Sequence, residues 1–206
     1  MKQPPEELAQ RLWEVSDEFL ALSSDVKIDE LAELTGVPRA TLYYYFSGKN
    51  DVLSFLLTQK VLRGTAVVAE AAAGAGTPTE RLAAVLRAML HAMADSPVLC
   101  TRLLGWMVTE RGGDVFVETE RALMAPVREL LIEGRAAGEF SDLDPFDAAT
   151  ALMGAVSMVA MRHATSGSFD PDAIADRLVP SLLNGLRTRA EPEPSAAPPR
   201  RRRPSG

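Results

Sequence analysis

The residues of this sequence that are best equipped for chemistry form a short cluster of hydrogen-bond donors around one small residue. The cluster consists of Arg39, Ala40, Thr41, Tyr43, Tyr44 and Lys49. A guanidinium can form two hydrogen bonds with the edge of a guanine base, and threonine and tyrosine hydroxyls can bind phosphate oxygens. A small alanine among them allows a helix to approach its partner closely. These residue types indicate the binding of double-stranded DNA.

The residues around the cluster predict a helix-turn-helix that would position it. In the first helix Leu31 and Leu34 recur at helical spacing, and Ala32 leaves room for another helix to approach. Gly36 can adopt a positive φ at little cost, so it predicts the turn. Pro38 is preset for the first position of the second helix. In this motif the second helix lies in the DNA major groove.

The second helix is predicted to turn its donors outward. Leu42 and Phe46 fall one turn apart and are expected to point inward, which leaves the donor cluster on the outer side. Lys49 is expected to open the following helix, with its amine and free N–H groups directed at phosphate. No acidic residue occurs between Glu33 and Asp51, so this stretch is predicted to be locally electropositive.

An aromatic core is the alternative interpretation of the three consecutive tyrosines, Tyr43, Tyr44 and Tyr45. Three neighbouring side chains cannot all face one side of a helix, so at least one must meet solvent or a partner. The ordered turn and lysine around the tyrosines favour the DNA interpretation.

The run from Ile28 to Leu53 contains T-G-V-P, then T-L-Y-Y-Y-F and S-G-K, followed by a hydrophobic helix. It resembles the DNA-binding signature of the tetracycline-repressor (TetR) family of transcriptional regulators. The resemblance implies phosphate contacts for Thr41, Tyr43 and Lys49. It implies positions at or near base edges for Arg39, Ala40 and Tyr44. It also implies that Tyr45 and Phe46 mainly pack the small domain.

Two features depart from the family pattern. The family usually has Thr or Ser as the cap of the first helix, whereas Asp25-Val26-Lys27 precedes Ile28 here. Asp25 is therefore the only candidate cap, slightly out of register. The preceding segment, predicted as one helix from Glu7 to Leu22, lacks the usual glycine before the loop.

Composition excludes several classes of function. With 206 residues, 47% hydrophobic and 24% charged, the chain can bury a core of ordinary size. Cys100 is the only cysteine, which excludes a disulfide framework and indicates a reducing cytoplasm. His91 and His163 lie 72 positions apart, and no nucleophile–base pair, metal-binding motif or phosphate loop is visible. We therefore expect no enzyme, no metal and no cofactor.

No targeting signal or membrane span is expected. The first seven residues are polar and contain prolines. The longest apolar run, Ala148 to Met161, is interrupted and too short to cross a bilayer. The prediction is a cytoplasmic protein without a membrane partner.

The net charge of −6 limits how DNA could be bound. Residues 1–64 hold ten acidic and seven basic side chains, a net charge of −3. Phosphate binding must then depend on a focused patch, doubled by dimerisation. The expected result is modest non-specific affinity with a moderate salt dependence.

The predicted architecture is all-α, with about nine helices and no convincing strand. Residues 1–48 form a three-helix domain with the helix-turn-helix. Residues 49–189 form a helical bundle for ligand binding and dimerisation, in which 49–73 is the connecting helix. Helix starts are predicted at Thr77-Pro78, Ser96-Pro97, Asp144-Pro145 and Asp170-Pro171. Gly112-Gly113 should break the chain, and Pro126 should kink or split its helix.

Residues 190–206 are predicted to be a disordered basic tail. Arg200 to Arg203 would attract any polyanion, which suggests a DNA arm. A solvated end without a role is the favoured alternative.

A helix predicted from Pro145 to Ala164 is apolar nearly all round, so it must be covered on every side. The predicted second cover is the same helix of another subunit, assisted by the last helix of the chain. The predicted contacts are Ala149, Leu152, Ala155, Val159, Leu178 and Leu182. A symmetric four-helix interface would place two recognition helices about 34–36 Å apart on a palindromic operator. The family resemblance implies the same dimer.

Flexible thioethers and aromatic residues concentrate in the larger domain and could line an adaptable apolar pocket. The candidate pocket residues are Met89, Met93, Trp106, Met107, Phe116, Met124 and Met153. Ordinary core packing is the alternative for each of them. The resemblance implies that this domain binds a small, often hydrophobic effector. Filling the pocket should then move helix 49–73, change the separation of the two Arg39-bearing helices and release DNA.

Two functions of different class follow. The first is a ligand-responsive repressor that binds an operator as a homodimer, repression being the commoner behaviour in the family. The second is a helical protein-interaction module without DNA binding, in which the donors would be idle.

Overall fold

The computed structural model describes residues 3–21, 27–97 and 110–187, with side chains for 3–19, 27–97 and 122–187. Within these ranges it contains nine helices and no strand, so the predicted all-α class is confirmed. The helices are α1 Glu6–Glu14, α2 Ser16–Ala21, α3 Ile28–Thr35, α4 Arg39–Tyr45, α5 Lys49–Ala72, α6 Pro78–Ala94, α8 Glu110–Ala136, α9 Pro145–Ser166 and α10 Pro171–Leu186. Most of the helix predicted after Ser96-Pro97, and the tail with Arg200 to Arg203, lie outside the described residues.

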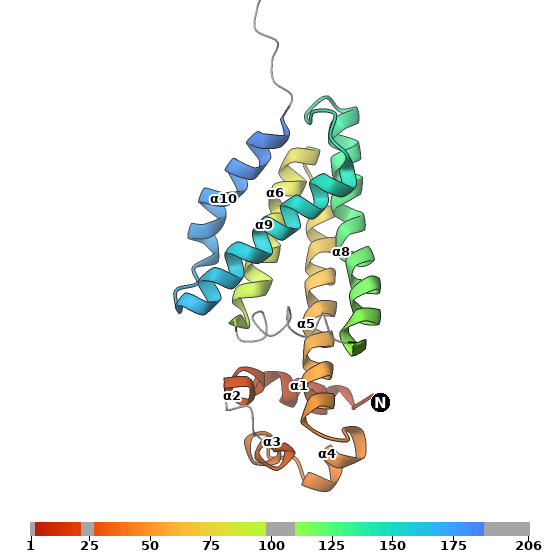
Figure 1. The fold of residues 1–206 in the computed structure, drawn as a ribbon, viewed down its shortest axis with the longest axis vertical. Helices are drawn as coiled ribbons and strands as arrows, with labels where there is room; N and C mark the ends of the chain where they lie inside the picture. The colour runs from red at the N-terminus through yellow and green to blue at the C-terminus, as the bar shows by residue number, and fades with distance from the viewer. Residues whose placement is uncertain (1–2, 22–26, 98–109, 188–206) are drawn as a thin grey trace, which may run out of the picture.

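The four N-terminal helices and the beginning of α5 surround one small core (Figure 1). Its buried residues are Leu8, Leu12, Phe19, Ile28, Leu31, Ala32, Val37, Leu42, Phe46, Val52, Phe55, Leu56 and Leu57. The last four of these belong to α5, so the first turns of this helix complete the N-terminal unit. α5 then continues as a long rod into the rest of the molecule.

The second core lies in the bundle formed by the later part of α5 with α6, α8, α9 and α10 (Figure 1). α6 packs against all four of the other helices and is therefore the centre of the bundle. Val68 and Ala72 of α5 are buried there beside Leu82 and Leu86 of α6. A single helix thus carries buried residues of both cores.

α5 also has the length and composition of a membrane-crossing helix, with a mean hydropathy of 1.3 over 18 residues and one third of that window buried. Core helices of globular proteins have the same composition. The buried apolar residues of α5 contribute to the two cores, which gives its hydropathy a structural reason.

Local capping signals fix three of the helix starts as predicted. Thr77 accepts a hydrogen bond from the Glu80 N–H at 3.2 Å, and the Glu80 carboxylate accepts one from the Thr77 N–H at 2.8 Å. This reciprocal pair is a capping box at the start of α6. Asp144 and Asp170 accept hydrogen bonds from first-turn N–H groups of α9 and α10.

The single helix predicted from Glu7 to Leu22 is wrong, because the chain forms α1 and α2 with Val15 between them. Ser16 is buried, and its hydroxyl donates to the Trp13 carbonyl oxygen at 2.7 Å. A serine hydroxyl that binds a nearby carbonyl competes with the regular helix, so the break has a local cause.

Asp25, the cap predicted for the helix-turn-helix, lies outside the described residues. In the structure α3 begins at Ile28 with Lys27 at the capping position. The Glu30 carboxylate reaches back to the Lys27 N–H at 3.4 Å. An acidic side chain in the first turn thus binds the N–H of the capping residue, and it also complements the helix dipole.

Neither the break predicted at Gly112-Gly113 nor a split at Pro126 occurs, since α8 continues from Glu110 to Ala136. A glycine costs a helix only about 1 kcal/mol relative to alanine, which is too little to end a long helix by itself. A proline inside a helix removes one backbone hydrogen bond, and a helix of 27 residues retains the others.

The connection between α8 and α9 is tied to the rest of the bundle through Glu139. Its Oε2 atom accepts hydrogen bonds from the Thr79 hydroxyl at 2.5 Å and the Thr79 N–H at 2.9 Å. Next to it, the Ser141 N–H donates to the Leu186 carbonyl oxygen at 2.8 Å. These bonds join the start of α6, the connection and the end of α10.

The Glu139 carboxylate predicts a pH-dependent stability. The hydrogen bond from the Thr79 hydroxyl, followed by that from its N–H, lowers the pKa of Glu139 below its ordinary value of 4.5. A lowered pKa means that this stabilisation is present above pH 4.5 and is lost as the pH falls through the lower, folded-state pKa. Glu139→Gln should therefore lower the melting temperature at pH 7, and the difference from wild type should shrink at pH 3. An equal difference at both pH values, measured by circular dichroism, would contradict this.

Candidate nucleic-acid interface

The turn before α4 is held in place by backbone conformation and by Thr35. Gly36 has φ 65°, in the left-handed region that favours glycine, as the sequence predicted. The Thr35 hydroxyl donates to the Leu31 carbonyl oxygen at 2.7 Å and accepts from the Val37 N–H at 3.3 Å. Pro38 is the residue before the helix rather than its first residue, so α4 begins at Arg39.

The inward side of α4 is fixed by two fully buried side chains. Leu42 and Phe46 are both 0% exposed, and the Phe46 ring lies 5.6 Å from the Phe55 ring of α5 between centroids. Tyr45 is half-buried and packs against the same core. The predicted inward and outward sides of this helix are therefore confirmed.

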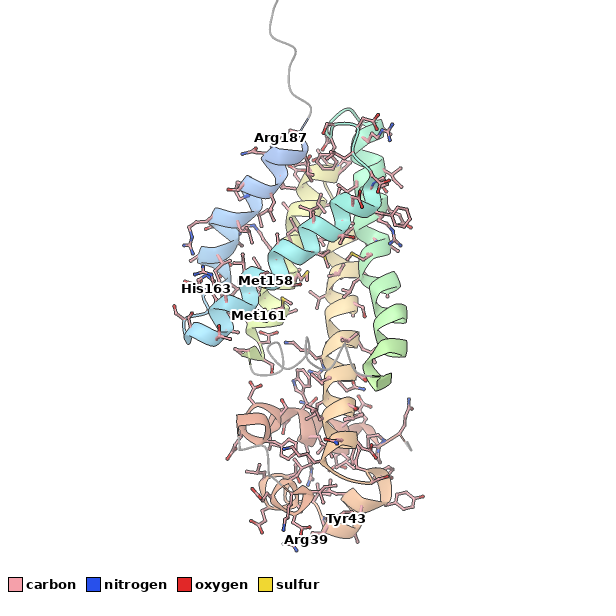
Figure 2. All side chains as sticks on the ribbon, in the orientation of Figure 1. Arg39, Tyr43, Met158, Met161, His163 and Arg187 are labelled. Atoms are coloured by element: carbon pink, nitrogen blue, oxygen red, sulfur yellow. The ribbon has the colours of Figure 1, made fainter. Side chains whose placement is uncertain are left out.

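The predicted donors are brought together on the outer side of α4. Tyr43 is 52% and Tyr44 60% exposed, and Arg39, Ala40 and Thr41 are exposed as well. Figure 2 shows Arg39 and Tyr43 at the end of the molecule formed by α3 and α4, opposite Arg187. A flat or concave partner, such as a DNA groove, could reach this end without obstruction from the bundle.

Lys49 begins α5 beside this surface and is half-buried. In the same turn, the Asp51 carboxylate accepts a hydrogen bond from the Ser47 N–H at 2.9 Å. A negative charge in the first turn stabilises the helix, but it also offsets part of the attraction that a helix N-terminus exerts on phosphate. Lys49 and Asp51 thus place opposite charges in the first turn of α5.

The prediction that this stretch is locally electropositive is wrong. Nη1 of Arg39 lies 3.3 Å from Oδ2 of Asp29, and Nη2 lies 3.6 Å from Oε1 of Glu33. Both carboxylates come from α3, and folding brings them to a guanidinium six to ten positions later in the chain. The count of acidic residues between Glu33 and Asp51 could not show this, because it considered only neighbours in sequence.

A hollow of about 230 Å³ lies between the start of α1 and α4. Its lining residues are Pro5, Glu7, Leu8, Arg11, Val37, Pro38, Thr41 and Tyr45. Arg11 is a cation that the sequence analysis did not consider, and it shares this hollow with Thr41. Its guanidinium is paired with Glu7 at 2.8 Å, four residues earlier on α1.

Two family models cover most of the chain. Residues 24–54 match the bacterial regulatory proteins of the tetR family, and residues 75–186 match the tetracyclin repressor-like C-terminal domain. This chain belongs to the TetR family. It is a DNA-binding transcriptional regulator, and the resemblance noted in the sequence is confirmed.

Solved structures of TetR-type proteins have the same overall fold. A TetR/AcrR-family transcriptional regulator from Thermobifida fusca is 25% identical and covers 89% of this chain and 100% of its own, with a TM-score of 0.74. The fatty acid degradation regulator FadR from Bacillus halodurans is 21% identical over 91% of this chain and 100% of its own, with a TM-score of 0.76. FadR from Bacillus subtilis, solved in complex with stearoyl-CoA, is 22% identical over 88% and 98%, with a TM-score of 0.70. No curated protein matches the sequence significantly.

The structure of this TetR-family protein describes only some of the residues predicted to line the effector pocket. Met89 and Met153 are buried, and Met93 and Met124 are half-buried against the same core, so four methionines from α6, α8 and α9 belong to the bundle core. Trp106 and Met107 lie outside the described residues, as does the side chain of Phe116. A surface hollow of about 330 Å³ lies elsewhere, between α8 and the start of α9, and none of the predicted pocket residues lines it.

Two of the predicted dimer contacts are buried inside their own subunit. Ala149 is 0% and Leu152 3% exposed, so neither offers a surface to a partner, and this part of the prediction is corrected. Ala155, Val159, Leu178 and Leu182 are half-buried. Sequence showed that α9 is apolar on all sides, but only packing against α6 and α8 decides which side remains outside.

Polar contacts between the N-terminal unit and the bundle were not indicated by the sequence analysis. Lys60 of α5 is only 8% exposed, and its Nζ donates to the Ala92 carbonyl oxygen of α6. The hydroxyl of Ser96, beyond the end of α6, donates to the Asp17 carboxylate of α2. The sequence did contain one signal, because Lys60 lies on the apolar side of α5 and a buried lysine requires polar partners.

Proposed function

We propose that this regulator is a repressor that binds a palindromic operator as a homodimer and is released by a small apolar effector. The observation that carries the proposal is the rigid placement of α4. Its inner side is locked by Leu42 and Phe46, and its outer side presents one guanidinium and three hydroxyls to solvent. Such donors suit the phosphates and base edges of a major groove.

Within this proposal Tyr43, Thr41 and Lys49 bind phosphates and fix the position of the helix. Arg39, Ala40 and Tyr44 lie at the base edges. Few cations take part, so the salt dependence of binding should be moderate. Selection from a pool of duplexes with a randomised core is the direct test. The expected product is an inverted repeat with half-sites about one helical turn apart. Recovery of no preferred sequence by the wild-type protein would contradict the proposal.

A second copy of the chain is the proposed cover of α9. Ala151, Gly154 and Met158 are exposed, and Ala155 between them is half-buried. Their spacing of three and four residues places them on one side of the helix. Small residues permit close approach of another helix, and Met158 is 59% exposed and marked in Figure 2. This outer stripe replaces Ala149 and Leu152 in the proposed dimer contact.

Met158→Arg should convert the dimer to a monomer, because it places a charge at the centre of an apolar contact. Ile132→Arg is the matched control: it introduces the same charge at an equally exposed apolar position on α8, at 55% exposure. Sedimentation velocity should show a monomer for the first variant and a dimer for the second. Dimers in both cases would rule out the outer stripe of α9 as the interface.

The bundle is the proposed effector site, supported by the four methionines that belong to its core. Flexible thioethers can adapt to the shape of an apolar ligand. A ligand changes DNA affinity only if it binds two arrangements of the dimer unequally. The contacts of Lys60 and Asp17 with the end of α6 are a physical route from the bundle to α5 and the N-terminal unit. If a compound binds tightly to the bundle and leaves operator affinity unchanged, that would contradict an effector role for the site it occupies.

A further inference from the structure

The recognition helix has one positive charge, and two carboxylates of α3 lie against it. Arg39 is the only charged residue in α4. Asp29 approaches its Nη1 at 3.3 Å and Glu33 approaches its Nη2 at 3.6 Å. The two acids are four residues apart, hence on the same side of α3. Their side chains are 35% and 76% exposed, and that of Arg39 is 58% exposed.

This arrangement is poorly suited to a phosphate clamp. A guanidinium with two carboxylates beside it forms a group with a net charge of −1. A phosphate that approaches Arg39 therefore meets two like charges within about 4 Å of the cation, and like charges close together raise the free energy of the complex. Non-specific DNA binding depends almost entirely on phosphate contacts, so the carboxylates should weaken it.

The same arrangement is well suited to a base edge. Guanine presents two neutral acceptors in the major groove, so it does not repel the carboxylates as a phosphate does. A guanidinium has five N–H donors in a fixed plane, and Asp29 and Glu33 each approach only one of its terminal nitrogens. The remaining donors can serve the base, while the acids restrict the orientations that the long side chain would otherwise adopt.

We propose that Asp29 is a positioning and specificity-determining residue that makes Arg39 a base reader rather than a phosphate contact, with Glu33 in a supporting role. This inference rests on the proposed DNA contact of α4. The alternative is that the pair of Asp29 and Arg39 only stabilises the fold, to which exposed ion pairs contribute little. In that case the loss of Asp29 would change specific and non-specific DNA affinity by the same factor.

The test uses the full chain and two DNA probes: the duplex selected by the wild-type protein, and a duplex of the same length and composition with a shuffled sequence. Asp29→Asn should tighten binding to the shuffled duplex and reduce the specificity ratio about 10-fold, the range that one arginine–guanine contact provides. Sequence selection with this variant should also show a weakened base preference at one position of each half-site. Glu33→Gln should change the ratio in the same direction by less, because its pair is longer and more exposed.

The matched control is Glu30→Gln. Glu30 lies in the same first turn of α3 and loses the same charge, but its side chain binds the Lys27 N–H, which glutamine can also do. This variant should strengthen binding to both duplexes similarly and leave the ratio unchanged. In an Arg39→Ala background, Asp29→Asn should no longer change the ratio. Thermal melts of all variants report whether the N-terminal unit remains folded.

The possible outcomes separate this inference from the proposed function. A ratio that falls equally in Asp29→Asn and Glu30→Gln would overturn the role of Asp29 and leave the regulator proposal intact. A selected sequence that is unaffected by Arg39→Ala would show that Arg39 reads no base, which also overturns the inference. If the wild-type protein selects no sequence, both proposals fail. If Asp29→Asn is unfolded, the Glu33→Gln variant decides. A ratio of specific to non-specific affinity equal to that of the wild type would then overturn the inference.

Discussion

Removing the phenolic hydroxyl of Tyr43 and the charge of Lys49 together should lower operator affinity by more than about 100-fold, because hydrogen bonds to a charged phosphate contribute about 1.5–3 kcal/mol each. The double variant Tyr43→Phe/Lys49→Gln retains the aromatic ring at position 43 and a polar, slightly shorter side chain at position 49. Tyr43 is half exposed and contributes nothing to the buried core, so the fold should persist. Fluorescence anisotropy with the selected duplex measures the loss.

The matched control is Tyr45→Phe/Arg177→Gln, which removes one hydroxyl and one positive charge away from the proposed contact. Tyr45 is half-buried behind the outer side of α4, and Arg177 is exposed on α10. This variant should bind the operator as the wild-type protein does. Equal affinity of wild type, test variant and control would instead show that Tyr43 and Lys49 make no contact with the operator.

Phe46→Ala should destabilise the N-terminal unit by about 3–5 kcal/mol and abolish operator binding, as removal of a buried phenylalanine leaves a cavity. Phe46 is fully buried beside Phe55, at the point where α4 meets the first turns of α5. A change of this size is a large fraction of the 5–15 kcal/mol that typically separates folded and unfolded states. Urea unfolding followed by circular dichroism measures it.

Phe146→Ala provides the control for this substitution. It removes the same side chain from the surface, where Phe146 is 62% exposed and lies under the Arg128 guanidinium at 4.6 Å. Its effect should not exceed about 1 kcal/mol, since a cation–π contact at an exposed site contributes about 0.5–1 kcal/mol. Similar losses for both variants would mean that Phe46 does not anchor α4.

Much of the fold followed from local signals that act over a few residues. Thr77, Asp144 and Asp170 cap helices in the structure as the sequence predicted, because a cap requires only a side chain and the next three N–H groups. The turn at Gly36 followed for the same reason, since its φ of 65° depends on one residue type. Two other local signals were misleading: Gly112-Gly113 did not end α8, because a glycine costs a helix little, and the apolar rhythm across Val15 did not show the break caused by the Ser16 hydroxyl.

The candidate DNA surface was also largely readable from sequence. Leu42 and Phe46 define the inner side of a short helix by their spacing, so the outward direction of Arg39, Tyr43 and Tyr44 followed from helix geometry alone. The position of Arg39 and Tyr43 at one end of the molecule depended on the rest of the fold (Figure 2).

By itself, the sequence determined the helix class, the helix-turn-helix and the donors on its outer side, because helical periodicity and capping act within a single turn or two of chain. Tertiary structure decided which charges surround those donors and which side of each apolar helix remains exposed. Asp29 and Glu33 reach Arg39 only when α3 and α4 cross, and Ala149 is hidden only when α9 packs on its own bundle. Coulomb interactions and burial depend on distances in space, and the distances between residues far apart in the sequence are set only when the chain folds.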